Sequence, residues 1–446
     1  MDKNVEAALS LHEDPKTTKW WRQEKELEQE EDQEADEEEN EEYYEALSWE
    51  DKNWPLVLSG FVINILASLG SNNLGMLFMP RLLELGLSQR LMSGTMNISL
   101  VAANLLCIPA TPLLHRWGCR RLLLLVGCVY STAFSLAAIA FSMPGLFIAT
   151  AIVAGSLQEV VILVVQVTVS RCFKRRRPLA VGMTGAGISI NQIMGPPLIA
   201  FMQSHYNPRT VMLVISILML QICVAASLMP SGSDHGGLQP ANRLAMVRRR
   251  EVVILCLVIA ITSATMSTFS ATVPLALLNN GCSPRDMVPY LSMSGVANLV
   301  ARVAIGLLLC HLYTSSLVMR VSSALSAATI PVWFWCKRTF WRVAWLSLCR
   351  GSNGVVKGLI SLVTLEVVGL QWQAEVLSLI NLTTGIATLL VGQLTDLPQA
   401  LTKSYASKFY TMTALLMMTQ LLWQFLDVRT SEASPKYRQQ TADRNS

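Results

Sequence analysis

The chain has 446 residues, of which 52% are hydrophobic and only 15% are charged, and its formal net charge is +4. Soluble domains average about 25% charged residues, so this composition excludes an ordinary soluble globular protein. The charge is also unevenly placed. Residues 1–51 carry 20 acidic and 5 basic side chains, whereas residues 52–446 carry 11 acidic and 30 basic ones.

The acidic part comes first in the chain. Its sequence EKELEQEEDQEADEEENEE holds too little apolar surface to fold, so we predict that residues 1–52 form a disordered cytosolic tail. Two interpretations stay open for this tail. It is either a solvated extension, or a segment that binds a basic partner or repels the anionic inner leaflet.

The remaining chain repeats apolar runs of about 20 residues, each long enough to cross the roughly 30 Å hydrocarbon core of a membrane as a helix. We predict an all-α integral membrane protein with twelve transmembrane helices in two six-helix halves, 53–229 and 251–427. The predicted spans are 54–79, 93–114, 122–142, 145–170, 178–202, 210–229, 251–279, 287–312, 317–336, 341–366, 374–395 and 406–427.

A polar segment divides the two halves. Residues 230–250 are rich in glycine and proline and end in cations, so we predict a cytosolic linker there, and residues 428–446 form a second cytosolic tail. The loops predicted on the linker's side carry 16 Lys and Arg residues, and the opposite loops carry 9. The positive-inside rule therefore places both termini in the cytosol. Two such halves are the arrangement of a major facilitator, which binds its substrate between them.

The sequence holds no pattern typical of a catalytic or metal site. The five histidines are scattered, no Cys/His cluster has metal-ligand spacing, and no glycine-rich loop carries the Gly-Lys-Ser/Thr of a nucleotide site. We therefore predict a transporter rather than an enzyme, partly by elimination, with no metal and no cofactor. A small-molecule substrate and the lipid bilayer are its expected partners.

The stretch RCFKRRRPLAVGMTGAG, residues 171–187, joins a cationic burst to a run of small residues. Spans flank it on both sides, which argues against a nucleic-acid patch. We interpret the cations as the loop after the fourth span and Pro178 as the start of the fifth helix. The glycines then allow close helix packing, which a rocking bundle needs.

This stretch resembles a signature of the monocarboxylate transporter family, solute carrier 16. The signature is an aromatic pair, basic residues, Leu-Ala-x-Gly and a small-residue run that ends in Ala-Gly, matched here by Phe173, Arg175, Arg176, Gly182 and Gly187. HRWGCRR (115–121), with Arg120, looks like the family's loop between spans two and three. LEVVGLQWQAEVLSL (365–379) and GQLTD (392–396) look like its tenth-to-eleventh region. The resemblance implies monocarboxylate transport at the plasma membrane, family-motif or gating roles for these residues, and a single-span accessory glycoprotein as a candidate partner.

Two positions depart from the proton-coupled members that the chain resembles. Those members carry a lysine in the first span and an aspartate one turn before the arginine of the eighth span. By alignment these positions hold Asn72 and Asn298, and only the arginine, Arg302, is retained. An amide cannot ionise, so the departures argue against the family's proton coupling at these two positions.

Charged side chains within the spans are the predicted site residues, because burying a charge in a membrane is costly unless it faces a cavity or a partner. We predict Arg302 as the carboxylate anchor, with Asn298 on the same helix face one turn earlier. Arg350 and Lys357 share a second face, although Arg350 could instead reach the outer interface. Asn72 is a cavity-facing amide or a helix-packing one.

Glu159 is the only acid deep in the first half of the sequence. It could form an ion pair with Arg302 or Lys357 across the halves, or it could take up a proton and couple transport to it. The sequence thus predicts a secondary transporter of small organic anions, above all monocarboxylates, that works by alternating access. Two alternatives stay open: a facilitative transporter of a larger or zwitterionic solute, such as an aromatic amino acid or a carnitine-like compound, and a non-transporting membrane scaffold.

Overall fold

The computed structural model describes residues 52–86, 89–174, 176–230, 249–279, 284–309, 315–336, 338–402 and 404–425. The acidic tail, most of the linker and the C-terminal tail lie outside these ranges. Contacts separate Met1–Trp54 from Pro55–Ser446, and the second unit is described here. Within the described ranges its secondary structure consists of helices joined by short turns and loops.

The first half of the sequence supplies seven described α-helices. They are α3 (Trp54–Asn72), α4 (Leu74–Glu84), α5 (Gln89–Ile139), α6 (Pro144–Ser156), α7 (Gln158–Cys172), α8 (Arg177–His205) and α9 (Pro208–Ala226). The second half supplies α11 (Arg250–Asn279), α12 (Pro284–Leu309), α13 (Ser315–Trp335), α14 (Thr339–Val368), α15 (Gln373–Thr402) and α16 (Tyr405–Phe425).

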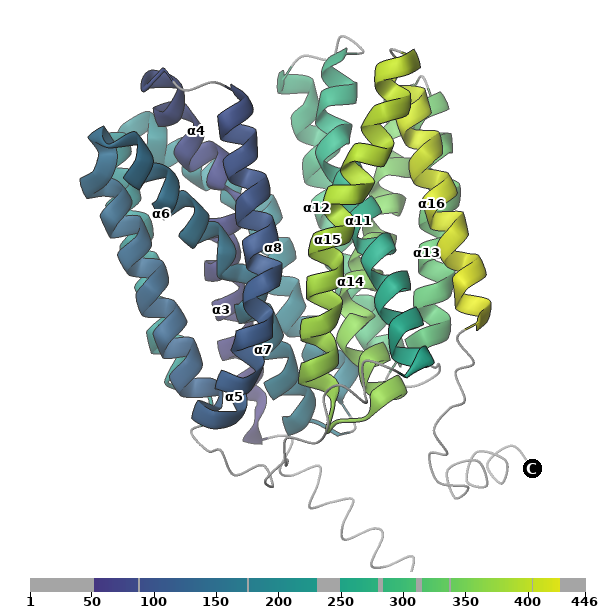
Figure 1. Cartoon of the computed structure of the whole chain (residues 1–446), viewed down its shortest axis with the longest axis horizontal. Helices are drawn as coiled ribbons and strands as arrows, with labels where there is room; N and C mark the ends of the chain where they lie inside the picture. Colours follow the sequence, from purple (N-terminus) through teal and green to yellow (C-terminus); the bar gives the residue numbers. More distant parts are fainter. Residues whose placement is uncertain are drawn as a thin grey trace, which may run out of the picture. The chain divides into compact units, whose positions relative to one another are not determined.

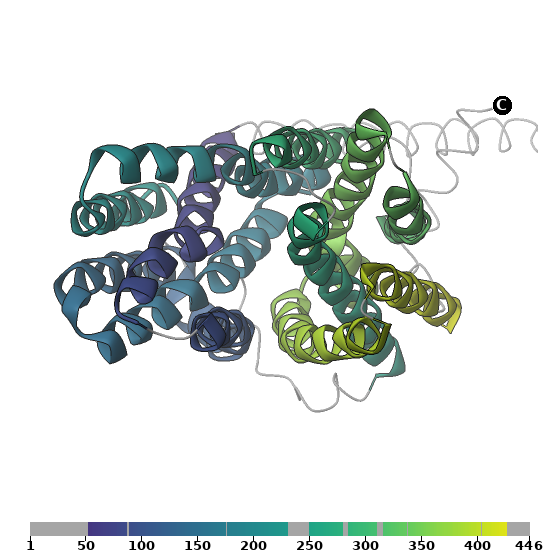
Figure 2. The same cartoon turned by 90° about the horizontal axis from the view of Figure 1, so that it is seen from above.

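The two sets of helices form two groups within this unit. Figure 1 shows α3 to α9 beside α11 to α16, and the view from above in Figure 2 separates the same two sets. Contacts between the groups run from α8 to α12 and from α5 and α7 to α15. The start of α3 and the end of α16 lie at the same, lower end of Figure 1, as an even number of membrane crossings requires.

The helices carry the apolar surface that a membrane protein presents to lipid. Nine described stretches are long and apolar enough to span a membrane, and one of them, Ile98–Ile139, includes most of both the second and the third predicted span. Large apolar side chains face outward, including Ile139, Phe340 and Leu401, of which 73–84% is exposed. The all-helical membrane fold is therefore confirmed, whereas the count of twelve spans stays a prediction.

Two spans predicted as single helices are interrupted. The first is divided at Asn73, between α3 and α4, and the fourth is divided at Leu157, between α6 and α7. Beside each break a polar side chain bonds back to the helix: Asn73 Nδ2 donates to the Leu69 carbonyl at 3.1 Å, and Ser156 Oγ donates to the Val153 carbonyl at 2.8 Å. Such local bonds compete with the helix ladder and bend it.

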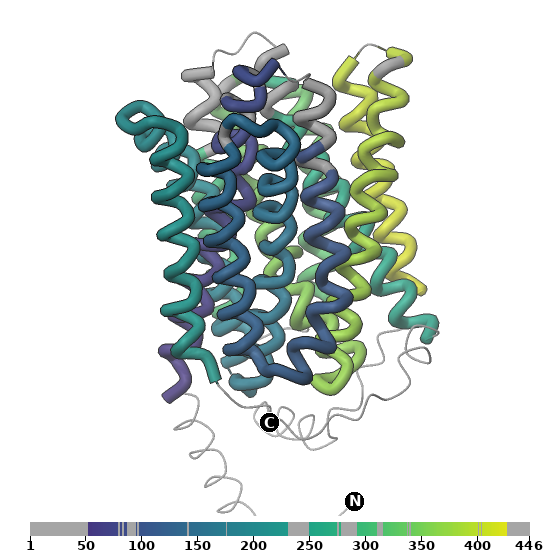
Figure 3. Tube along the Cα trace, turned by 60° about the vertical axis from the view of Figure 1, so that its left-hand side comes forward, coloured from purple at the N-terminus to yellow at the C-terminus, as the bar shows by residue number. Residues whose placement is uncertain are grey.

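The predicted loop after the second span is shorter than expected. Only Gly118 departs from helical geometry within α5, with φ 77° and ψ 167°. A positive φ of this kind favours glycine, which has no Cβ to clash with the backbone. Figure 3 shows the two limbs of α5 joined at the lower end of the view.

Each half has its own aromatic core. In the first half the rings of Phe78 and Phe147 have centroids 4.9 Å apart. In the second half Phe269, Trp333 and Phe409 meet edge to face at 5.3–5.9 Å. Because each core is complete within one half, the halves can move relative to each other without opening either core.

Candidate functional site

A cavity of about 650 Å³ lies between the two halves. Helices α3 to α8 line it from the first half, and α11, α12, α14 and α15 line it from the second. The structure brings six predicted residues to this one cavity: Asn72, Glu159, Asn298, Arg302, Arg350 and Lys357. Among the described lining residues, three are therefore cationic and one is acidic.

Arg302 is buried in the second half of α12, with only 3% of its surface exposed. Its Nε donates to Asn298 Oδ1 at 3.1 Å, and its Nη1 donates to the Gly185 carbonyl at 3.0 Å across the halves. A guanidinium has five N–H groups in a rigid fork, so these two bonds fix the side chain and leave three N–H groups for a ligand. The outer edge of such a fork, formed by Nη1 and Nη2, matches the two oxygens of a carboxylate.

Asn298 holds three helices together behind Arg302. Its Oδ1 accepts from Arg302 and also from Ser189 Oγ of α8 at 2.8 Å. Its Nδ2 donates to the Arg350 carbonyl of α14 at 3.3 Å. A Cβ at Gly354 would approach the Asn298 side chain within 2.9 Å, so glycine is needed for this close packing. The amide thus fixes the position of the Arg302 side chain.

The other charges lie on α14 and α7. Lys357 and Glu159 are close enough for their charges to attract across the cavity. Arg350 lies about 16 Å along α14 from its start and Arg350 Nη1 donates to Ser270 Oγ of α11. The positive charges of Arg302 and Arg350 repel that of Lys357. Glu159 therefore offsets the charge of Lys357. The two arginines, Arg302 and Arg350, leave the cavity with a net positive charge.

The small-residue run of the 171–187 stretch packs against Arg302 from behind. A Cβ at Gly182 would meet the Arg302 carbonyl at 3.0 Å, and one at Gly185 would meet Arg302 Nη1 at 3.0 Å. Gly187 faces the other way, and a Cβ there would lie 2.5 Å from the Phe61 carbonyl of α3. These glycines let α8 lie directly between α12 and α3.

The remaining predicted motif residues do not line the cavity. Phe173 is fully buried at the end of α7, Arg176 precedes the first turn of α8, and Arg120 follows the turn of α5 at Gly118. Arg175 lies outside the described residues. The motif therefore contributes to the site through helix packing behind it.

Three of the stretches that resemble monocarboxylate transporters meet at the lower end of the halves. His115 Nε2 of α5 lies 2.9 Å from Glu375 Oε1 of α15, and the charge of Arg171 of α7 also acts on Glu375. Nearby, Ser170 Oγ and Ser361 Oγ are 3.3 Å apart. These contacts join α5 and α7 of the first half to α14 and α15 of the second.

Glu375→Gln should weaken this contact between the halves, because it removes the charge that attracts Arg171 and the carboxylate that bonds to His115. Partly exposed ion pairs contribute about 0.2–1 kcal/mol, so a Ser361→Cys side chain should react with a maleimide up to about fivefold faster. Glu366→Gln is the matched control, because Glu366 caps Ser315 and Ser316 within the second half. Equal rates in both variants would contradict a role for Glu375 in holding the halves together.

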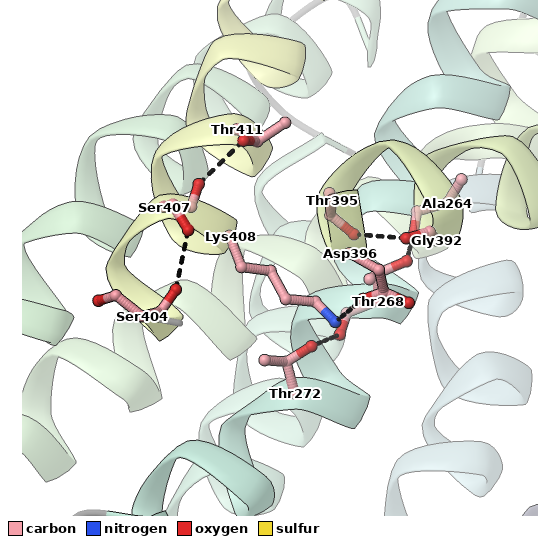
Figure 4. Close-up of polar contacts among 10 residues, drawn as sticks. All are labelled: Ala264, Thr268, Thr272, Gly392, Thr395, Asp396, Ser404, Ser407, Lys408 and Thr411. Atoms are coloured by element: carbon pink, nitrogen blue, oxygen red, sulfur yellow. Dashed lines mark hydrogen bonds and ion pairs between the residues drawn. The ribbon is translucent and has the colours of Figure 1, made fainter. Parts of the chain in front are cut away.

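A second polar cluster lies away from the cavity. Figure 4 shows Lys408 of α16 in an ion pair with Asp396 of α15, beside Thr268 and Thr272 of α11. None of the ten residues drawn there is among the described residues that line the cavity. Asp396 of the GQLTD stretch thus forms an ion pair that joins α15 to α16.

Several lining residues were not predicted from the sequence. They include uncharged amides and hydroxyls on seven helices, among them Gln158, Gln166, Gln192, Ser267 and Asn353. One signal is visible in retrospect. Ser263, Ser267 and Ser270 recur at helical spacing in an apolar span, which indicates one polar helix face.

Comparison with known proteins agrees with this fold. The chain matches the family model described as Major Facilitator Superfamily over residues 60–392. The solved structure of the human organic anion transporter MFSD10 (TETRAN) covers 83% of this chain and 99% of its own at a TM-score of 0.64 and 16% identity. The structure of the transporter FucP in the outward conformation matches 83% of this chain and 98% of the FucP chain, at a TM-score of 0.67 and 13% identity.

Among curated proteins the chain is similar to monocarboxylate transporters, in agreement with the resemblance of the 171–187 stretch. It is 29% identical to monocarboxylate transporter 14 of Mus musculus over 180 residues, which are 40% of this chain and 34% of that protein. It is 30% identical to monocarboxylate transporter 4 of Rattus norvegicus over 139 residues, 29% of this chain and 30% of that one. The matched region thus spans about a third of each relative. The family model covers well over half of this sequence, and the chain belongs to the Major Facilitator Superfamily.

Proposed function

We propose that this protein is a secondary transporter of small organic anions, above all monocarboxylates, with Arg302 as the carboxylate anchor. The observation that carries the proposal is the cationic cavity between the halves, in which Arg302 is held by two hydrogen bonds and keeps three N–H groups for a ligand. Asn72, Asn298, Arg350 and Lys357 complete the proposed site. The names of the curated relatives support the same class of substrate.

Alternating access would require the contacts around Glu375 to break while others form at the opposite end. The complete aromatic core of each half supports such a movement of two rigid groups, 53–229 and 251–427, joined by the 230–250 linker. We retain as proposals the plasma-membrane location, the cytosolic termini and the accessory glycoprotein. Transport rather than catalysis is supported by the fold and by the names of the relatives.

The alternative of an aromatic or carnitine-like solute has less support. Aromatic faces are the usual recognition element for quaternary ammonium groups and for aromatic rings. None of the described residues that line the cavity is aromatic. A scaffold without transport would gain nothing from an anchored cation at the centre of a cavity.

Uptake by the purified, full-length chain in proteoliposomes tests this proposal. Labelled lactate should accumulate in protein-containing vesicles, and unlabelled lactate should compete with it. Empty vesicles give the background. No saturable uptake or exchange of any carboxylate would favour the scaffold.

We propose that transport is either uncoupled from protons or coupled to them through Glu159, because Asn298 cannot ionise. If Glu159 carries the proton, an imposed inward proton gradient drives uptake in the wild type, and Glu159→Gln abolishes that drive while exchange at equal pH continues. The expected loss of gradient-driven accumulation is complete, since an amide cannot take up a proton. Glu84→Gln, an acid paired with Arg81 off the cavity, is the control. Accumulation that survives Glu159→Gln would contradict coupling through Glu159.

A further inference from the structure

The cavity holds more unused hydrogen-bonding groups than a short aliphatic acid could satisfy. Ser263 and Asn353 line it with 6% and 5% of their surface exposed. Ser263 Oγ and Asn353 Oδ1 have no hydrogen-bond partner among the described residues. Gln166, 9% exposed, likewise bonds to no other described side chain or carbonyl. Because buried polar groups are nearly always hydrogen-bonded, these groups require water or a ligand.

These groups lie on three helices: Asn353 lies on α14 between Arg350 and Lys357, and the others lie on α11 and α7. On α11, Ser263, Ser267 and Ser270 follow one face over about 10 Å, and Ser270 Oγ is itself bonded to Arg350. On α7, Glu159 and Gln166 face the cavity over a similar length. A ligand whose anionic end meets the arginines would therefore extend between two polar helix faces.

We infer that the substrate is a carboxylate that carries several hydroxyl groups, the class of the sugar acids. The inference rests on the proposed function, because the carboxylate end uses the same Arg302 fork. The hydroxyl groups would donate to and accept from Ser263, Ser267, Asn353 and Gln166, each of which can do both. The cavity volume of about 650 Å³ falls in the range of about 300–1,000 Å³ that is typical of ligand pockets. Such pockets hold ligands larger than a three-carbon acid.

Ligands that separate the two chemical features test the inference on the wild-type chain. Gluconate has a carboxylate and five hydroxyl groups, propionate has only the carboxylate, and sorbitol has only the hydroxyl groups. Measured by displacement or by competition with uptake in proteoliposomes, gluconate should bind at least about tenfold more tightly than either, since each net hydrogen bond contributes about 0.5–1.5 kcal/mol.

A variant then locates the hydroxyl recognition. Gln166→Met keeps the shape of the side chain and removes its amide, and it should weaken gluconate binding about five- to tenfold while propionate binding changes less than twofold. Gln221→Met is the matched control, because Gln221 is an exposed amide of α9 off the cavity. Neither ligand should respond to it.

The outcomes distinguish this inference from the proposed function. If propionate binds as tightly as gluconate and both need Arg302, carboxylate transport stands and hydroxyl recognition is overturned. If sorbitol binds as tightly as gluconate, or if none of the three binds, both the carboxylate anchor and the sugar-acid class are overturned. If Gln166→Met affects both carboxylates equally, hydroxyl recognition by Gln166 is wrong.

Discussion

Replacing Arg302 by glutamine is expected to lower carboxylate uptake at least about 30-fold. Removing one partner of a buried, hydrogen-bonded charge pair costs about 2–5 kcal/mol, and 2 kcal/mol corresponds to about 30-fold in affinity. Glutamine can still donate to the Gly185 carbonyl or to Asn298, so the packing behind the site is retained. Labelled lactate and labelled gluconate, measured over a range of concentrations, report the effect.

Two further variants separate charge from geometry. Arg302→Lys keeps the positive charge and loses the planar fork, so its uptake should lie between that of the wild type and that of Arg302→Gln. Arg320→Gln is the matched control, because Arg320 packs over the Trp423 ring in the same half and off the cavity. It should leave uptake within about twofold. A folded Arg302→Gln protein with wild-type uptake would contradict the anchor assignment.

Gly187→Ala is expected to lower the stability of the folded protein by about 1–3 kcal/mol, the usual cost of overpacking. The added Cβ would lie 2.5 Å from the Phe61 carbonyl and 3.3 Å from Asn64 Cβ, so α3 and α8 would have to separate. Asn64 Nδ2 donates to the Thr184 carbonyl across the same contact at 2.9 Å, and this bond would lengthen. The apparent Tm in detergent should therefore fall.

Gly392→Ala controls for the loss of a glycine from a helix. Gly392 lies within α15 and a Cβ there would meet no atom within 4 Å, so alanine should raise stability by about 0.5–1 kcal/mol through helix propensity. Opposite signs for the two glycines are the expected result. Equal Tm values would show that α3 and α8 are not in close contact at Gly187.

The charged side chains show how far the sequence alone reaches. Glu159, Arg302, Arg350 and Lys357 were predicted from their positions in apolar spans, and all four line one cavity. The reason is energetic. A charge in a membrane-spanning helix is too costly to face lipid, so it must face a cavity or a partner, and this constraint can be applied without coordinates.

For the uncharged polar side chains, the sequence could not predict which ones face the cavity. Asn72 and Asn73 are neighbours of the same type, yet Asn72 faces the cavity, whereas Asn73 is buried against α8 and bonds to its own helix. An amide in a span can be satisfied by the backbone, by a neighbouring helix or by a ligand at similar cost. The helix breaks at Asn73 and Leu157 depend on the same local competition.

In the 171–187 stretch, some features followed from the sequence and others depended on the tertiary structure. Its cations, its starting proline and its glycines predicted a loop followed by a closely packed helix, because those residue types fix charge placement and backbone freedom locally. Which neighbour each glycine would face was decided only by the tertiary structure. Gly182 and Gly185 contact α12 at Arg302, and Gly187 contacts α3, since helix crossing depends on the packing of three helices at once.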